Sequence, residues 1–382
     1  MKPASAGDYR DLARRRLPHF LFEYIDGGAH DEITMRRNRS DLEAVALRQR
    51  VMRDVSAIDL STDLFGEHLT MPVALGPIGL AGLTARRGEV QAARAAEAAG
   101  VPFCLSTVSA CSLGEVTGAL AAPCWFQLYM LRDRAFMSDL LVQAKARGVT
   151  RLIFTVDMPV PGTRYRDYRS GLAGAPGITG DVRRVWQALA RPRWAWDVGL
   201  RGRPHGLGNV APVLGGKTGL DDFFAWMRDN FDPTATWADL EWLRAEWPGP
   251  LMLKGVLDPA DAIKAADVGA DAVIVSNHGG RQLDGAQSTA SVLPRIAAAV
   301  GGRIKVLADG GVRSGADVVR MLALGADVVL LGRAWAFALA GGGERGVAHM
   351  LDLIRSEMKV TMALTGTVRC ADISGESLHR PG

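Results

Sequence analysis

The sequence has few of the residues that would point to a metal centre, a disulfide framework or a nucleic acid. It contains only four cysteines, and they have neither metal-ligand spacing nor the density of a disulfide scaffold. We therefore expect reduced thiols in a cytosolic environment. The formal net charge is only +4, and no array of interleaved basic and aromatic residues occurs. We therefore expect no nucleic-acid partner, and the charge suits a small anion or a membrane surface.

Long apolar runs are also absent. No uncharged apolar run reaches the 18 residues that a membrane-spanning helix requires. No apolar core follows the first basic residues, so we expect no signal peptide. At 48% hydrophobic and 23% charged, the 382 residues have the composition of a globular protein, and we expect one large domain rather than two modest ones.

From Met71 onward, short runs of Val, Ile and Leu alternate with Ala-rich amphipathic segments. This alternation predicts a parallel sheet with helical crossovers. The expected strands lie near 72–76, 101–105, 125–129, 151–156, 250–255, 271–276, 304–308 and 327–332. Eight strands at this spacing favour a closed (β/α)8 TIM barrel, and a doubly wound open sheet is the alternative.

The remaining segments divide the single predicted domain, 1–382. Residues 1–70 are charged and mostly helical in pattern, and we expect an N-terminal helical cap. The barrel is expected over 71–362, with its last helix from Glu344 to Met362, followed by an irregular tail at 363–382. About 90 residues separate the fourth and fifth strands, which predicts an insertion at about 165–235.

The stretch from Ser276 to Gly285 follows a buried strand and holds His278 and Arg281, with two glycines between them. In a parallel α/β fold such loops build the active site. A histidine chosen blindly is more often structural, but the glycines allow close backbone approach to a ligand, and an arginine can bind a carboxylate beside the imidazole. This pattern suits proton abstraction from an anionic substrate.

Two glycine-rich turns indicate a phosphate site. Ala308 to Ser314 follows the seventh expected strand, and Leu331 to Arg333 follows the eighth. Barrels commonly bind phosphate there through backbone N–H groups and helix N-termini, with Arg313 and Arg333 as cations. Because many barrels share this feature, it does not by itself choose the chemistry.

Within the insertion, 183–203 contains six arginines, three tryptophans (Trp186, Trp194 and Trp196) and one acid, Asp197. It can be interpreted as a lid or an oligomer contact with a solvated basic face. The other interpretation is a membrane-surface patch, in which tryptophans lie at headgroup depth and arginines meet anionic lipid.

Ser-Asn-His-Gly-Gly-Arg-Gln-Leu-Asp at 276–284 closely resembles the active-site signature of the FMN-dependent α-hydroxy-acid dehydrogenases and oxidases. The resemblance spans nearly the whole chain, and within the family it is greatest to the bacterial respiratory L-lactate dehydrogenases. The other matching motifs are Tyr-Ile-Asp-Gly-Gly-Ala at 24–29, Gly-Pro-Ile-Gly-Leu-Ala-Gly at 76–82, Trp-Phe-Gln-Leu-Tyr at 125–129, Thr-Val-Asp-Met-Pro at 155–159 and Asp-Gly-Gly-Val-Arg at 309–313.

The resemblance implies FMN as the cofactor and oxidation of L-lactate to pyruvate, with His278 as the base and Asp157 as its partner. It further implies that Arg164 and Arg281 hold the carboxylate, while Tyr24 and Tyr129 contact the carboxylate or hydroxyl. From position alone, Tyr24 is more often an aromatic packing residue. The implied FMN-binding residues are Pro77, Ile78, Gly79, Ser106, Gln127, Thr155, Lys254, Ser276, Asp309, Gly310, Gly311, Arg313, Gly332 and Arg333.

For the electron acceptor, the resemblance implies the respiratory quinone pool. Gly79 stands where family oxidases often have alanine, and membrane-associated members reach the quinone through the inserted region. We therefore expect peripheral attachment to the cytoplasmic face of the bacterial inner membrane through about 183–203, with a cytoplasmic location as the alternative. A homo-oligomer, commonly a tetramer, is expected, and no fused haem domain.

Several alternatives stay open. The nearest is an oxidase of the same fold that passes electrons to oxygen. Val108 is smaller than the tryptophan of glycolate oxidase, which suits lactate but also longer 2-hydroxy acids. A barrel of the inosine-monophosphate-dehydrogenase type would need a Gly-Ser-x-Cys loop, which is lacking. A non-catalytic scaffold would predict loss of His278, Arg164 or Arg281, and all three are present. Whether the substrate is oxidised by hydride transfer or through a carbanion is also open.

Overall fold

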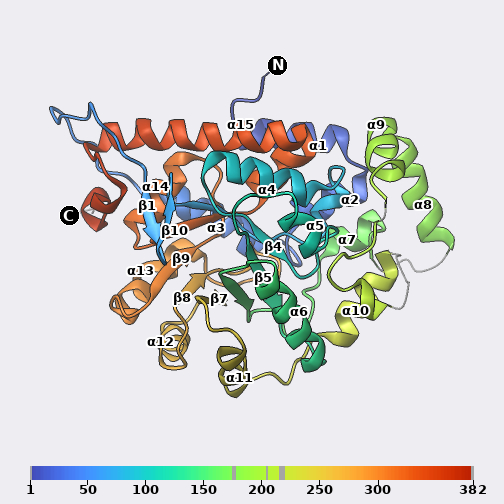
Figure 1. The fold of residues 1–382 in the computed structure, drawn as a ribbon. Helices are drawn as coiled ribbons and strands as arrows, with labels where there is room; N and C mark the ends of the chain where they lie inside the picture. Colours follow the sequence, from blue (N-terminus) through green and yellow to red (C-terminus); the bar gives the residue numbers. More distant parts are fainter. Residues whose placement is uncertain (1, 174–177, 204, 215–219, 380–382) are drawn as a thin grey trace.

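The computed structural model describes residues 2–173, 178–203, 205–214 and 220–379 (Figure 1). Within these residues, eight parallel strands pair in the order β3-β10-β9-β8-β7-β6-β5-β4. They are β3 (Val73–Leu75), β4 (Cys104–Ser106), β5 (Trp125–Tyr129), β6 (Leu152–Thr155), β7 (Leu251–Val256), β8 (Ala272–Val275), β9 (Lys305–Ala308) and β10 (Val328–Leu331).

The sheet closes between its first and last strands. An isolated parallel bridge joins Leu75 to Phe103, and the N–H of Leu75 donates to the carbonyl of Pro102 at 2.8 Å. The predicted TIM barrel is therefore confirmed, and each predicted strand overlaps an observed one. Closure brings the carboxyl ends of all eight strands to one face, where barrel enzymes place their active sites.

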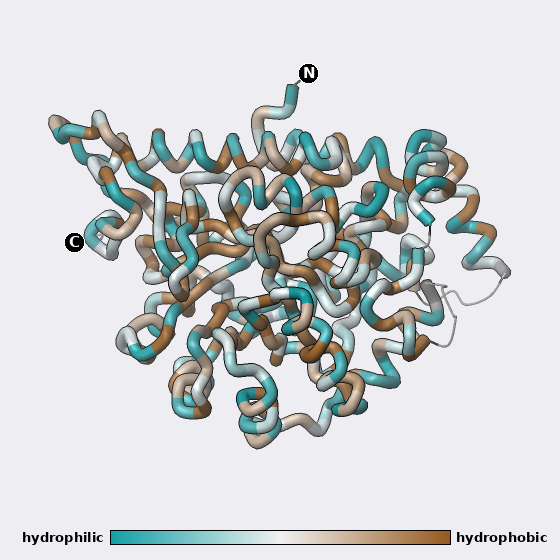
Figure 2. Tube along the Cα trace, viewed as in Figure 1, coloured by the Kyte–Doolittle hydropathy of each residue, from teal (hydrophilic) through white to brown (hydrophobic). Residues whose placement is uncertain are grey.

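Side chains fill the inside of the barrel. Inward-facing residues of the barrel strands, among them Trp125, Ile153, Met252 and Leu307, form a buried apolar cluster, and Figure 2 shows these strands as hydrophobic segments in the middle of the molecule. The cluster also includes Leu64 and Leu69, which belong to an antiparallel hairpin of β1 (Thr62–Leu64) and β2 (Glu67–Leu69). The prediction of a mostly helical 1–70 was wrong for this hairpin, which covers the amino end of the barrel.

Helices surround the sheet. Three precede the barrel: α1 (Ala6–Arg16), α2 (His19–Asp26) and α3 (Ile33–Ala44). The crossovers contain α4 (Gly88–Ala99), α5 (Leu113–Thr117), α6 (Arg134–Ala146), α12 (Pro259–Asp267), α13 (Thr289–Val300) and α14 (Gly315–Ala323). The last helix, α15 (Arg333–Thr365), is broken at Gly343, where φ is +62°, and its second half lies along α1 and α4 in Figure 1.

The insertion contains α7 (Tyr165–Ser170), α8 (Ile178–Leu189), α9 (Pro192–Trp194), η2 (Ala195–Leu200), η3 (Ala211–Leu214), α10 (Leu220–Asn230) and α11 (Ala238–Glu246). Trp186 and Trp196 are exposed as the membrane-surface interpretation requires. Trp194 corrects that interpretation, because it is buried and its indole donates to the carbonyl of Leu83 at 2.8 Å. Arg184 is also buried. None of the helices in the described residues is long and apolar enough to cross a membrane.

Candidate active site

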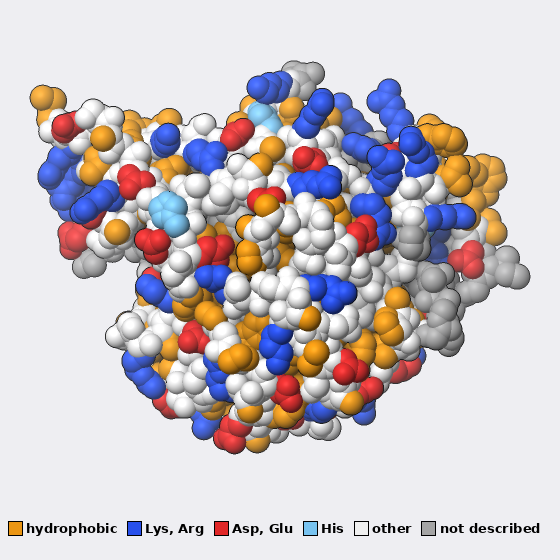
Figure 3. All heavy atoms as spheres, viewed as in Figure 1, with side chains coloured by type: hydrophobic (Ala, Val, Ile, Leu, Met, Phe, Trp, Pro, Cys, Tyr) orange, Lys and Arg blue, Asp and Glu red, His pale blue; other side chains and the backbone are white. Residues whose placement is uncertain are grey.

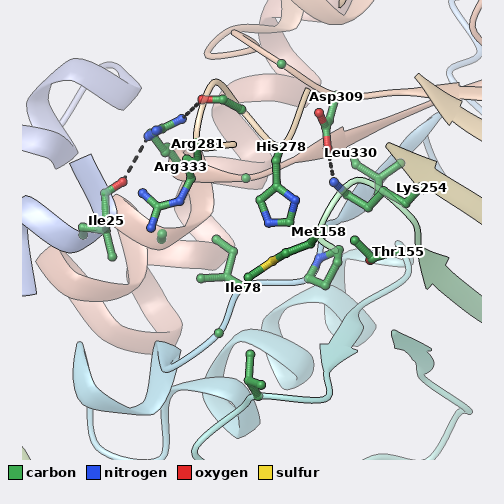
Figure 4. A pocket seen from close by; sticks show the side chains of 18 of the residues that line it. Ile25, Ile78, Thr155, Met158, Lys254, His278, Arg281, Asp309, Leu330 and Arg333 are labelled. Atoms are coloured by element: carbon green, nitrogen blue, oxygen red, sulfur yellow. Dashed lines mark hydrogen bonds and ion pairs between the residues drawn. The ribbon is translucent and has the colours of Figure 1, made fainter. Parts of the chain in front are cut away.

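A pocket opens where the carboxyl ends of the barrel strands meet. Its walls combine the strand ends with α2 and α10, and most of the residues predicted for the site line it. They are Tyr24, Pro77, Ile78, Gly79, Tyr129, Thr155, Arg164, Lys254, His278, Arg281, Asp309, Gly310, Gly311, Arg313, Gly332 and Arg333. Figure 4 shows the imidazole of His278 between Arg281 and Arg333 on one side and Lys254 and Asp309 on the other.

His278 is held in an unusual backbone conformation. Its φ is +57°, a left-handed value that is uncommon for a residue other than glycine. Its N–H donates to the hydroxyl oxygen of Ser276 at 3.0 Å, and the two glycines after it also have positive φ. Strained backbone of this kind persists where the surrounding structure fixes it and concentrates at functional sites.

The imidazole of His278 is paired with the half-buried carboxylate of Asp157. Its Nδ1 lies 3.0 Å from Oδ1 of Asp157. Burial lowers the pKa of His278 below its ordinary value and outweighs the opposite effect of Asp157. Burial would raise the pKa of Asp157, but His278 and Lys254 keep it below its ordinary value. A neutral imidazole beside a carboxylate donates through Nδ1–H, which leaves the Nε2 lone pair free to accept a proton.

Two guanidinium groups face the same space beside Tyr24. Arg281 donates to the carbonyls of Tyr24 and Gly27 at 2.6 and 2.7 Å, and both Arg164 and Arg281 lie over the Tyr24 ring. Burial, together with Arg164 and Arg333, lowers the pKa of Arg281 to about 9. Arg164 pairs with Asp167 at 3.5 Å, yet its buried Nε has no hydrogen-bond partner among the described residues. Buried positive charge of this kind favours a bound anion.

A second cationic pair, Arg313 and Arg333, also lines the pocket, and Arg333 lies next to Arg281, since both donate to the carbonyl of Gly27. Arg333 donates to the carbonyls of Ile25, Gly27 and Gly279, and Arg313 donates to that of Val312. Neither forms an ion pair within the described part of the chain. Burial is the main cause that lowers the pKa of Arg313 to about 10 and the pKa of Arg333 to about 9. The two arginines therefore lack a negative partner.

Backbone groups also line the part of the pocket beside Arg313 and Arg333. Helix α15 begins at Arg333, so its first N–H groups are free to bind an anion. A methyl group built on Gly332 would meet open space, whereas one on Gly311 would lie 2.3 Å from the carbonyl oxygen of Asn38. Gly311 also has a φ of +87°, so a glycine is required there. The phosphate site expected from the two glycine-rich turns stays a prediction.

On the other side of His278 from Arg281 and Arg333 (Figure 4), Lys254 is buried and paired with Asp309, with Nζ 3.0 Å from Oδ2. Burial opposes the charge on Lys254, but Asp309 and Asp157 raise its pKa above the ordinary value. The Lys254 ammonium also donates to the Ser276 hydroxyl at 2.9 Å. Among the described residues, Oδ1 of Asp309 is buried without a hydrogen-bond partner, which leaves an acceptor beside the pocket for a ligand hydroxyl.

Four predicted site residues, Ser106, Gln127, Asp157 and Ser276, lie behind the pocket walls. Gln127 is fully buried, where it accepts from the Ser106 hydroxyl and donates to that of Thr155, both at 2.9 Å. Only Thr155 of these three reaches the pocket. The predicted contacts of Ser106 and Gln127 with a flavin ring stay predictions.

The sequence analysis missed one wall of the pocket. Phe223, Phe224 and Met227 of α10 line it, together with Met158 after β6. The signal was present, because Phe-Phe-x-x-Met places these side chains on one face of a helix. They were not singled out because the insertion was interpreted as a surface feature. Close by, Phe231 stacks on Tyr129 with ring centroids 5.0 Å apart.

Comparison with known proteins gives three consistent results. The model of the FMN-dependent dehydrogenase family matches residues 13–380. The L-lactate dehydrogenase of Caulobacter sp. (strain K31) is 64% identical and aligns over 95% of both chains, and that of Stenotrophomonas maltophilia (strain R551-3) is 60% identical over 98% of both. The solved structure of the monotopic membrane protein (S)-mandelate dehydrogenase superposes with a TM-score of 0.94 at 35% identity, covering 100% of both chains.

Proposed function

Since this chain belongs to the FMN-dependent dehydrogenase family, we propose that it oxidises L-lactate to pyruvate with FMN as its cofactor. The proposal is supported by L-lactate dehydrogenases at 60% and 64% identity over nearly their full length. The observation that carries it is the paired His278 and Asp157 beside Arg164 and Arg281, because this set combines a base with a carboxylate site.

The residues present fit FMN. Arg313 and Arg333 form no ion pair among the described residues, and the start of α15 offers N–H groups, so this part of the pocket suits the FMN phosphate. The unpaired Oδ1 of Asp309 suits a ribityl hydroxyl. Lys254 would hold a positive charge near the ring system. When bound, FMN supplies the two-electron acceptor that no side chain can provide.

The chain's own residues orient the acid and move its proton. We infer that Arg164 and Arg281 bind the carboxylate, which fixes the α-carbon and its hydroxyl near Nε2 of His278. Nε2 accepts a proton, and the new positive charge is stabilised by Asp157, 3.0 Å from Nδ1. Tyr129 is buried with a raised pKa, so its hydroxyl stays protonated and can donate to the substrate.

The first test is anaerobic mixing of the FMN-loaded protein with L-lactate while the flavin absorbance is followed, and then separate addition of air or a quinone analogue. Bleaching that only the quinone reverses supports a quinone-linked dehydrogenase. Rapid recovery in air would instead identify an oxidase. Absence of bleaching by L-lactate would refute the proposed substrate and direct the assay to other 2-hydroxy acids.

We also propose peripheral membrane contact through α8, α9 and η2. Val185, Trp186, Leu189 and Trp196 are exposed there, and Figure 3 shows hydrophobic side chains beside Lys and Arg over this region. Apolar side chains next to arginines suit the headgroup layer of an anionic bilayer. The (S)-mandelate dehydrogenase structure, described as a monotopic membrane protein, supports the proposal.

Vesicle co-sedimentation tests this contact. Wild-type protein should sediment with vesicles containing anionic phospholipid, and Trp186→Ser should weaken binding several-fold because its indole is 70% exposed. Val142→Ser on α6 is a matched control, since Val142 is 55% exposed and lies outside 183–203. Equal binding of Trp186→Ser and wild type would count against this surface.

A further inference from the structure

One buried amide of the insertion, that of Asn209, bonds the Ser106–Leu113 segment at the end of β4. This side chain is 6% exposed and lies between η2 and η3. Its Nδ2 donates to the carbonyl of Ser106 at 3.2 Å and to the hydroxyl of Ser109 at 3.0 Å. Its Oδ1 accepts from the N–H of Leu113 at 2.6 Å. One side chain therefore satisfies three polar groups of the segment that follows β4.

The backbone beside Asn209 makes the same contact. The N–H of Gly208 donates to the carbonyl of Ser109 at 3.1 Å. A methyl group built on Gly208 would lie 2.2 Å from the nitrogen of Ser112, so a side chain cannot fit while the two segments remain this close. Leu207 and Val210 on either side are buried. The insertion is thus packed directly against the Ser106–Leu113 segment.

That segment contains Val108, which lines the pocket. The carbonyl of Val108 accepts from the N–H of Leu80 at 3.1 Å. Its Cγ2 would lie 2.8 Å from a methyl group built on Gly79, which lines the same wall. A shift of the turn held by Asn209 would therefore change the space between Val108 and Gly79.

We propose that Asn209 is a positioning residue that sets the gap between Val108 and Gly79, and thereby the room for the side chain of the 2-hydroxy acid. The inference rests on the proposed function and deepens it. Asn209 does not line the pocket, so it acts through the turn and not on a reacting atom. The insertion in this way contributes to substrate selection as well as to surface contact.

The test compares Asn209→Ala with His205→Ala, using FMN-loaded protein and L-lactate or L-2-hydroxybutyrate as substrate. His205 is a matched control, because its Nε2 also bonds a carbonyl oxygen, that of Gly199, but within the insertion. The preference is the kcat/KM for L-lactate divided by the kcat/KM for L-2-hydroxybutyrate. We expect Asn209→Ala to lower this ratio by about tenfold, because the two acids differ by one methylene group and a pocket discriminates one methylene group by about that factor. His205→Ala should leave this preference unchanged.

A double-mutant cycle with Val108→Ala separates positioning from general stability. If Asn209 acts through Val108, the two substitutions will not be additive in the substrate preference. The visible circular dichroism of bound FMN, measured without substrate, should differ between Asn209→Ala and wild type. Both spectra are recorded at a temperature well below the melting temperature of either protein, so that a difference does not come from unfolding. Additive effects, or an equal loss with both acids and an unchanged dichroism, would overturn the inference. Failure of wild-type protein to oxidise either acid would instead refute the proposed function.

Discussion

Replacement of Asp157 by Asn tests whether Asp157 stabilises the positive charge that His278 gains when it accepts the proton. The substitution keeps the shape of the side chain and removes the charge 3.0 Å from His278 Nδ1. Two unit charges about 4 Å apart attract by about 4 kcal/mol at an effective dielectric constant of about 20. If half of the imidazolium charge has formed in the transition state, the barrier rises by about 2 kcal/mol, or roughly 30-fold in rate. If the imidazolium charge is fully formed in the transition state, the rate falls by about 10³-fold.

The substitution should also move the pH dependence of kcat/KM in a defined direction. His278 must be neutral to accept a proton, so kcat/KM falls as the pH drops through its pKa, which burial places below the ordinary value. Asp157 raises that pKa, and removing it therefore lowers the pKa further. The variant should be slower at every pH near neutrality, while its acid limb moves to lower pH.

The assay is the pH profile of kcat/KM for L-lactate with a quinone analogue, on protein of equal FMN content. Asp157→Glu is a useful companion, since it keeps the charge and changes its distance. An acid limb that moves to higher pH in Asp157→Asn, or a rate within twofold of wild type, would refute the pairing described here.

Three further predictions concern the walls of the pocket. Arg281→Lys should raise the KM for L-lactate by about tenfold or more in steady-state assays while FMN stays bound, because lysine lacks the two-pronged donor. Arg313→Gln should weaken FMN binding by about 30-fold or more in fluorescence titration of the apoprotein, since a buried anion loses a cation. Gly79→Ala should lower kcat/KM by about tenfold, because its methyl group would lie 2.8 Å from Val108, and adding Val108→Ala should restore part of the loss. Unchanged values would contradict each prediction.

The barrel could be predicted from the sequence because its strands are buried on both faces and read as continuous apolar runs. The β1–β2 hairpin could not, because strands of three residues carry too little periodicity, and Leu64 and Leu69 gain their role only when the barrel closes over them. The predicted strand ends did converge on one pocket, since parallel strands place their carboxyl ends together.

The insertion was harder to interpret. Its arginines and tryptophans formed a compositional signal, but composition does not separate the exposed Trp186 from the buried Trp194. The pocket wall from α10 and the amide of Asn209 depend on how the insertion folds back against the barrel, across about 100 residues of sequence separation from Ser106. Such long-range contacts have no local pattern in the sequence.

The most direct test of the proposed chemistry is anaerobic rapid mixing of L-lactate with wild-type protein and with His278→Ala, both loaded with FMN. Because His278 serves the acid and not the cofactor, the variant should keep its FMN while flavin reduction slows by at least about 10²-fold. Reduction of His278→Ala at the wild-type rate would show that the base lies elsewhere and would contradict the mechanism proposed here.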